Sequence, residues 1–176
     1  MNKYQNQGGG SSDKTIYWLI GGFSLLALLG IGLVALGESK SQGQVASYTT
    51  NDTTRPKTVV KTKFFDLGNM KVTDEKTVEF AIENSGDKPL QLFKGSSSCG
   101  CTFGQIVING DKSPEFSMHS KSTWTGSVNP GEKATLLVTY KPSIMPVKGE
   151  VSRAVYVSTN DPDNKELTFT VKAFVE

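Results

Sequence analysis

The sequence predicts an all-β domain, an antiparallel β-sandwich, preceded by one N-terminal transmembrane helix and a disordered linker. Three observations predict this arrangement. Apolar and polar residues alternate through the C-terminal part of the chain, an uncharged apolar run lies near the N-terminus, and a stretch rich in Ser, Thr, Gln and Asn separates the two. A period of two marks strands with one buried and one solvated face. An uncharged run of about 20 residues is typical of a membrane-spanning helix.

The N-terminal part of the chain consists of a polar tail followed by an apolar segment. Residues 1–15 are polar and contain a Gly-Gly-Gly-Ser-Ser run, so we expect a disordered tail. Residues 16–36 carry no charge, and a helix of that length spans about 30 Å, the thickness of the hydrocarbon core. Tyr17 and Trp18 stand at its start, where aromatic rings favour the headgroup level. We therefore expect a transmembrane signal anchor over 16–37.

Cleavage and orientation of the apolar segment are separate questions. The alternative to an anchor is a cleavable signal peptide ending near Ala35-Leu36-Gly37, but cleavable apolar regions usually run only about 7 to 15 residues. Positive residues flank the segment on both sides, so charge alone does not fix its orientation. Large C-terminal domains are exported largely regardless of such charges. We expect a single-pass membrane protein whose domain lies outside the cytoplasm, in the cell envelope or periplasm.

The linker and the domain differ in composition. Residues 38–62 have few large apolar side chains, which predicts a flexible linker. Residues 63–176 form the predicted domain, and its 13 basic and 14 acidic side chains leave no nucleic-acid footprint. The chain has one histidine and no Gly-rich phosphate loop after a strand, which argues against most hydrolases and nucleotide enzymes. We expect a monomeric, non-enzymatic domain with a single core.

The expected strands share one pattern, an apolar side chain at every second position. These side chains are Val78, Phe80 and Ile82, then Leu90 and Leu92, then Ala134, Leu136, Val138 and Tyr140, then Val151, Val155 and Val157, and finally Leu167, Phe169, Val171, Ala173 and Val175. Turn residues separate the runs at Asn84–Asp87, Asn129–Glu132 and Asn160–Asn164. Short strands without an amphipathic helix between them indicate a sandwich of the immunoglobulin kind.

The only two cysteines, Cys99 and Cys101, are separated by Gly100 alone. They are compatible with two reduced thiols, a small disulfide ring or two soft ligands for a metal. A disulfide requires Cα atoms about 4.4 to 6.8 Å apart, which a bent Cys-x-Cys reaches if its middle residue tolerates unusual dihedrals, as glycine does. A ring this small gains little from loop closure, so stapling the fold is its least favoured purpose, and we expect it to be readily reduced.

Three further residues extend the metal hypothesis: Met118, His119 and Met145. Thiolate, thioether and imidazole together favour cuprous copper, and zinc fits less well because methionine is a rare zinc ligand. The competing interpretation is that the methionines fill apolar gaps, His119 is a surface loop residue, and the cysteines pair or stay buried. We favour the competing interpretation, because scattered residues of ligand type rarely converge.

Thiol–disulfide exchange is a third hypothesis for the cysteines. In it, Cys99 or Cys101 attacks a disulfide of a partner, and a strained ring suits that chemistry. Two features argue against it. No helix N-terminus lies nearby in the sequence to activate a thiol, and Lys94 is the only close cation.

Five sequence landmarks follow one another in the domain. They are Phe65–Gly68, Val78–Gly86, Cys99–Thr102, Pro130–Glu132 and Ser158–Asp161. In their order and spacing the chain resembles the bacterial domain-of-unknown-function family 1573 over about residues 63–176. The resemblance implies an immunoglobulin-like sandwich, usually exported or membrane-tethered, with no established enzymatic activity. It is weakest between Phe103 and Val128, where an insertion carries Phe116–His119 and Trp124.

Together these patterns predict a membrane-anchored extracytoplasmic module of binding or scaffolding type. Its partners are then the membrane, through residues 16–36, and an unknown protein. Copper is the one cofactor to consider, and metal handling is the alternative function.

Overall fold

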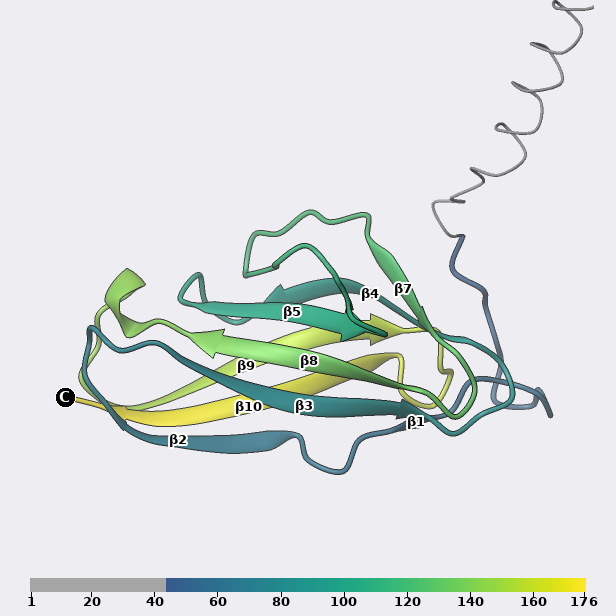
Figure 1. Cartoon of the computed structure of the whole chain (residues 1–176), viewed down its shortest axis with the longest axis horizontal. Helices are drawn as coiled ribbons and strands as arrows, with labels where there is room; N and C mark the ends of the chain where they lie inside the picture. The colour runs from purple at the N-terminus through teal and green to yellow at the C-terminus, as the bar shows by residue number, and fades with distance from the viewer. Residues whose placement is uncertain (1–43) are drawn as a thin grey trace, which may run out of the picture. The chain divides into compact units, whose positions relative to one another are not determined.

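The computed structural model describes residues 44–176, which form a sandwich of two five-stranded sheets (Figure 1). Sheet A has the order β1-β3-β8-β5-β6 and sheet B the order β2-β10-β9-β4-β7. The strands are β1 (Thr58–Val59), β2 (Phe64–Met70), β3 (Lys76–Asn84), β4 (Leu90–Ser97), β5 (Thr102–Ile108), β6 (Asp111–Lys112), β7 (Thr125–Val128), β8 (Lys133–Tyr140), β9 (Gly149–Thr159) and β10 (Glu166–Val175), with one 3-10 turn, η1 (Pro142–Ile144). The expected tail, the anchor and the first residues of the expected linker lie outside the described residues. Within 44–176 no helix is long and apolar enough to cross a membrane.

The all-β sandwich predicted from the alternation is confirmed. Every apolar residue assigned to an inward face in the five predicted runs is buried. Phe80 of β3 and Phe169 of β10 meet across the two sheets, with ring centroids 5.1 Å apart. Among the described strands only β2 departs from the antiparallel arrangement, because it runs parallel to β10. The core therefore forms between the inward faces that the sequence pattern marked.

Sheet pairing begins earlier than the sequence predicts. β1 lies inside the expected linker, and it pairs with the end of β3 through Thr58 opposite Asn84. The segment is fixed by backbone groups, since Ser85 N–H donates to the Lys57 carbonyl at 2.8 Å. Pro56 just before it is buried. The linker expected over 38–62 is therefore too long at its C-terminal end, because its last residues complete an edge of sheet A.

Lys76, at the start of β3, bridges the two sheets beside β2, which is an edge strand of sheet B. The pairing of β2 with β10 shifts around Gly68, whose φ of 67° lies in the left-handed region that favours glycine. The Lys76 ammonium donates to the Leu67 carbonyl at 2.6 Å and to the Asn69 carbonyl at 3.0 Å. One side chain of sheet A thus binds two backbone oxygens of the edge strand of sheet B.

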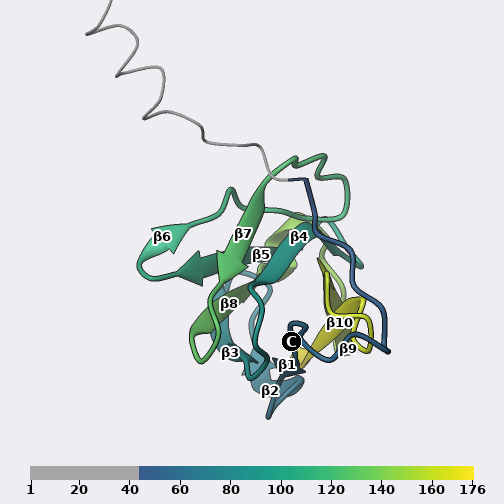
Figure 2. The same cartoon turned by 90° about the vertical axis from the view of Figure 1, so that its right-hand side faces the viewer.

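Phe116 fills the side of the sandwich that lies away from β2 and Lys76. Figure 2 shows the segment between β6 of sheet A and β7 of sheet B, which carries this residue across from one sheet to the other. Its ring is buried against Gly95 and Gly104, and a methyl group on Gly95 would approach the ring to 2.6 Å. The two glycines therefore leave the space that the ring occupies. The insertion after Phe103 thus contributes to the core.

Candidate functional site

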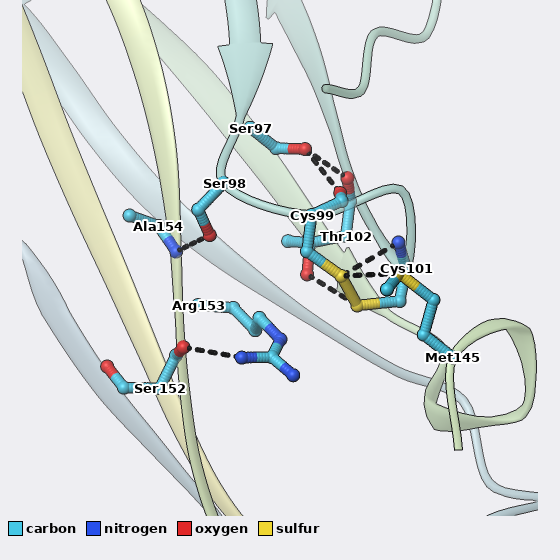
Figure 3. Close-up of a disulfide and its surroundings, with 9 residues drawn as sticks. All are labelled: Ser97, Ser98, Cys99, Cys101, Thr102, Met145, Ser152, Arg153 and Ala154. Atoms are coloured by element: carbon cyan, nitrogen blue, oxygen red, sulfur yellow. Dashed lines mark hydrogen bonds between the residues drawn. A yellow bond between two sulfur atoms is a disulfide. The ribbon is translucent and has the colours of Figure 1, made fainter. Parts of the chain in front are cut away.

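The two cysteines occupy the turn that connects β4 of sheet B to β5 of sheet A. A disulfide joins Cys99 to Cys101, whose Cα atoms lie 5.2 Å apart (Figure 3). Both residues are buried, with 6% of Cys99 and none of Cys101 exposed. The pair therefore lies under the surface at the end of the sandwich where the chain changes sheet.

Gly100 does not need unusual dihedrals to allow this ring. Its φ is not among the positive values of the described residues, and a methyl group placed on it would have no atom within 4 Å. The disulfide therefore does not use the tolerance of glycine for a positive φ, on which the sequence expectation relied. Alanine fits at this position as well as glycine.

Hydrogen bonds fix the turn around the disulfide. The Ser97 hydroxyl is buried and lies within hydrogen-bond distance of the carbonyls of Cys99, at 2.7 Å, and Thr102, at 2.8 Å. The Cys101 N–H points at the Cys99 sulfur at 3.0 Å, and the Cys101 carbonyl accepts from Lys141 N–H at 2.9 Å. A backbone N–H is thus already aimed at the Cys99 sulfur.

Met145 covers the disulfide from the loop after β8. Its sulfur lies 3.8 Å from the Cys99 sulfur. Three apolar side chains of this loop are exposed, Ile144 by 49%, Met145 by 51% and Val147 by 36%. We call residues 142–147 the Met145 loop. An exposed apolar surface therefore lies directly over a buried disulfide.

The structure brings together three of the five proposed metal ligands: Cys99, Cys101 and Met145. Met118 and His119 are exposed in the segment between β6 and β7, and within residues 44–176 neither forms a hydrogen bond or salt bridge with the cysteines. Within 44–176 no group of three or more His, Cys, Asp or Glu side chains is placed to hold a metal ion. The three convergent residues are all sulfur donors.

Arg153 of β9 was missed by the sequence analysis. Val151 and Val155 on either side are buried in the core, and alternation places Arg153 on the same inward face. Its guanidinium carbon lies 6.0 Å from the centroid of the Tyr140 ring on the opposite sheet. Figure 3 shows the side chain extending from β9 into the space beside the disulfide. The signal was present in the sequence, as a charged residue at an inward position of a valine run.

A cleft lies at the other end of β4. Its volume is about 340 Å³, and it is lined by Val45–Tyr48, Phe93 and Ser158–Pro162 together with Lys165. The buried carboxylate in its lining, that of Asp161, is engaged by hydrogen bonds from Asp163 N–H at 3.0 Å and the Asn164 amide at 2.9 Å. The disulfide end combines reactive atoms with exposed apolar groups, so we take that end as the candidate site.

Solved structures resemble the chain at low sequence identity, and one of them, from Porphyromonas gingivalis, shares the fold. A protein of unknown function from Porphyromonas gingivalis W83 has 16% identity and a TM-score of 0.51, over 77% of this chain and 51% of that one. The PapD-like domain 7 of human CEP192 has 13% identity and a TM-score of 0.42, over 76% and 97% of the two chains. The secreted serine protease VesC of Vibrio cholerae has 10% identity and a TM-score of 0.44, over 67% and 23%. The chain thus spans about half the length of the Porphyromonas protein.

Sequence comparison identifies the family. No curated protein matches the chain significantly. Residues 56–173, most of the chain, match the HYDIN/CFA65/VesB-like, Ig-like domain family. That span begins just before β1 and ends within β10, so it coincides with the sandwich. The chain therefore belongs to the HYDIN/CFA65/VesB-like family of Ig-like domains.

Proposed function

We propose that this protein is a membrane-anchored, extracytoplasmic binding or scaffolding module that contacts a protein partner through the Met145 loop. The observation that carries the proposal is the exposed apolar group Ile144, Met145 and Val147. Apolar side chains gathered on one exposed loop favour a protein contact, because such a contact removes them from water. The Ig-like family membership supports a binding module rather than an enzyme.

The setting of the module is also part of the proposal. The uncharged segment 16–36 would anchor it, and the narrower resemblance to the domain-of-unknown-function family 1573 favours a domain in the cell envelope or periplasm. The domain is then a monomer held at the membrane surface, with the Met145 loop free to meet another envelope protein.

Photo-crosslinking of the full chain in its source cells tests the binding surface. A photoreactive residue at Ile144 should give one discrete adduct with another protein. The same residue at Glu79, which is exposed on β3, serves as the matched control and should give none. Equal adducts at both positions, or none at Ile144, would contradict a binding surface at the Met145 loop.

Cuprous copper binding is a second candidate, favoured by the 3.8 Å approach of the Met145 and Cys99 sulfurs. Reduction of the disulfide would leave two thiols and a thioether together, and the thiols would bind as thiolates, because soft sulfur ligands select cuprous copper. In this hypothesis Met118 and His119 would have to move toward the sulfurs to supply further ligands, because both are exposed on the β6–β7 segment. The reduced chain should then take up one equivalent of copper, less at lower pH because bound thiolates must be deprotonated.

Serine variants separate copper binding from the plain binding module. Replacing both cysteines by serine should abolish uptake, and Met145→Leu should weaken it while keeping the loop apolar. His119→Ala should weaken uptake without unfolding the domain. Equal uptake by the wild type and the double-serine variant would eliminate the copper candidate.

A further inference from the structure

Two polar atoms at the disulfide end are buried without a hydrogen-bond partner. They are the hydroxyl oxygen of Tyr140, a residue only 1% exposed, and Nε of Arg153. The Arg153 guanidinium donates to the carbonyl of its neighbour Ser152 at 3.1 Å, and within 44–176 it forms no salt bridge. Burying such groups unpaired is costly. This end of the sandwich therefore offers positive charge and a free donor to an anion.

The pairing of β4 with β9 brings Arg153 close to the turn that carries the cysteines. Ser97 of β4 is opposite Val155 of β9. The pairing continues one residue further, because Ser98 N–H donates to the Ala154 carbonyl at 2.9 Å and the Ser98 hydroxyl accepts from Ala154 N–H at 2.9 Å. Extending this register by one more residue, into the turn, would set Cys99 across from Arg153, and Figure 3 shows the Arg153 side chain beside the disulfide.

We propose that Cys99–Cys101 is a redox-active disulfide that accepts two electrons from the dithiol of a partner protein, with Arg153 as the residue that stabilises the Cys99 thiolate. A cation and a backbone N–H aimed at a sulfur both favour its thiolate form. Arg153 supplies the cation, and Cys101 N–H supplies the donor at 3.0 Å. Opening the disulfide thus generates the anion that this end of the sandwich lacks.

The exchange proceeds in two balanced steps. A partner thiolate attacks the Cys99 sulfur, which is the more exposed of the two, so that the bond to Cys101 breaks and the Cys101 sulfur takes up a proton. The second partner thiolate attacks the partner's sulfur in the mixed disulfide and releases Cys99 as a thiolate. The partner ends as a disulfide, and the Cys99–Cys101 pair ends reduced by two electrons, with one partner proton on Cys101 and the other released to solvent.

The Met145 loop controls access to the attacked sulfur. Met145 lies against the Cys99 sulfur and is itself half exposed, so rotation of its side chain would open one side of that sulfur. A partner docked on the loop would displace that side chain, a step that rests on the binding surface proposed above. The exchange is stoichiometric, and it changes the loop because the thiol pair no longer fixes the turn beneath it.

Equilibration of the full chain, in mild detergent, with mixtures of reduced and oxidised glutathione tests the proposal without any partner protein. Trapping with N-ethylmaleimide and mass spectrometry measures the fraction reduced. We expect full, reversible reduction of the folded chain. Arg153→Gln should lower the equilibrium constant for reduction about tenfold, which is about 30 mV for a two-electron couple. Arg153→Lys should restore most of the loss. Lys172→Gln, which removes a cation from the outer face of the same sheet, is the matched control and should change nothing.

Variants with one remaining cysteine test whether Arg153 stabilises the thiolate or only supports the fold. In Cys101→Ser the remaining thiol, that of Cys99, should react with iodoacetamide. This reaction should persist to a lower pH than in the double variant that also carries Arg153→Gln. Cys101→Ser, which keeps Cys99, should also form a mixed disulfide with oxidised glutathione. Cys99→Ser should not, because its one remaining cysteine, Cys101, is fully buried.

Three results would overturn the proposal: reduction only after unfolding, equal constants for Arg153→Gln and Lys172→Gln, or equal trapping by the two serine variants. Because glutathione needs no docking surface, these results are independent of the crosslinking at Ile144. Loss of the adduct at Ile144 with retained glutathione exchange would instead reject the binding surface alone.

Discussion

The backbone N–H of Thr58 donates a 2.8 Å hydrogen bond to the carboxylate of Asp161, 103 residues further along the chain. The same carboxylate lies 3.6 Å from the Arg55 guanidinium. Through it the first strand of sheet A is fastened to the turn that follows β9 in sheet B. The carboxylate is fully buried, so its charge is balanced by these protein groups and not by water.

Replacing Asp161 by asparagine should lower the free energy of unfolding by about 1.5 to 3 kcal/mol, the range for hydrogen bonds to a charged group. The amide keeps the size but loses the charge and one acceptor oxygen. Urea unfolding measures the change. Asp163→Asn is the control, because its side chain is 45% exposed and its pairing with Arg55 at 2.6 Å is accessible to solvent. An equal loss in both variants would contradict the central role of Asp161.

Acid should weaken the fold through the same group. Burial raises the pKa of Asp161, but hydrogen bonds from Asn164 and from the N–H groups of Thr58 and Asp163 outweigh it, so the folded pKa lies below its ordinary value. A depressed folded pKa gives stability that is present above the unfolded value, about 3.9, and is lost as pH falls through the folded value. Unfolding of the wild type should therefore become easier below about pH 4, and Asp161→Asn should lack this component.

The inward and outward faces of β3 should respond differently to truncation. Phe80 is 1% exposed and packs against Phe169, so Phe80→Ala should cost about 3 to 5 kcal/mol. Glu79 is exposed, and Glu79→Ala should change stability by less than about 0.5 kcal/mol. Denaturant unfolding compares the two variants. Similar losses of unfolding free energy would mean that the inward and outward faces of β3 are assigned wrongly.

Two glycine-to-alanine variants compare a closely packed glycine with one that faces open space. Gly104→Ala places a methyl group against the buried Phe116 ring and should cost about 1 to 3 kcal/mol. Gly100→Ala meets no atom within 4 Å and should leave both stability and the disulfide unchanged. Thermal unfolding and a thiol count measure the effects. A larger loss at Gly100 than at Gly104 would refute this description of the turn.

The membrane anchor can be tested by partition. We expect the full chain to enter the detergent phase, while a fragment of residues 44–176 remains in the aqueous phase as a monomer. Recovery of the full chain from aqueous extracts, shortened near Gly37, would favour the signal-peptide alternative.

The faces of the strands were predictable because each depends on its own alternation. Val78, Phe80 and Ile82 mark their strand without reference to any other part of the chain. β1 was not predictable, since its two residues carry no pattern and depend on Asp161 from a distant turn. The site shows the same limit. The cysteines and Met145 were identified by residue type. The inward position of Arg153 could also be read from the sequence, but only the fold places its side chain beside the disulfide.

Lys76 has a consequence for copies of the protein that meet one another. An edge strand with free carbonyl oxygens can recruit a strand from a neighbouring molecule, and aggregation begins in that way. The ammonium of Lys76 occupies the oxygens of Leu67 and Asn69 and places a positive charge at the edge of β2. An incoming strand would have to displace that cation before it could pair. The lysine that joins the two sheets of one molecule thereby also opposes the growth of fibres by strand pairing between molecules at high concentration.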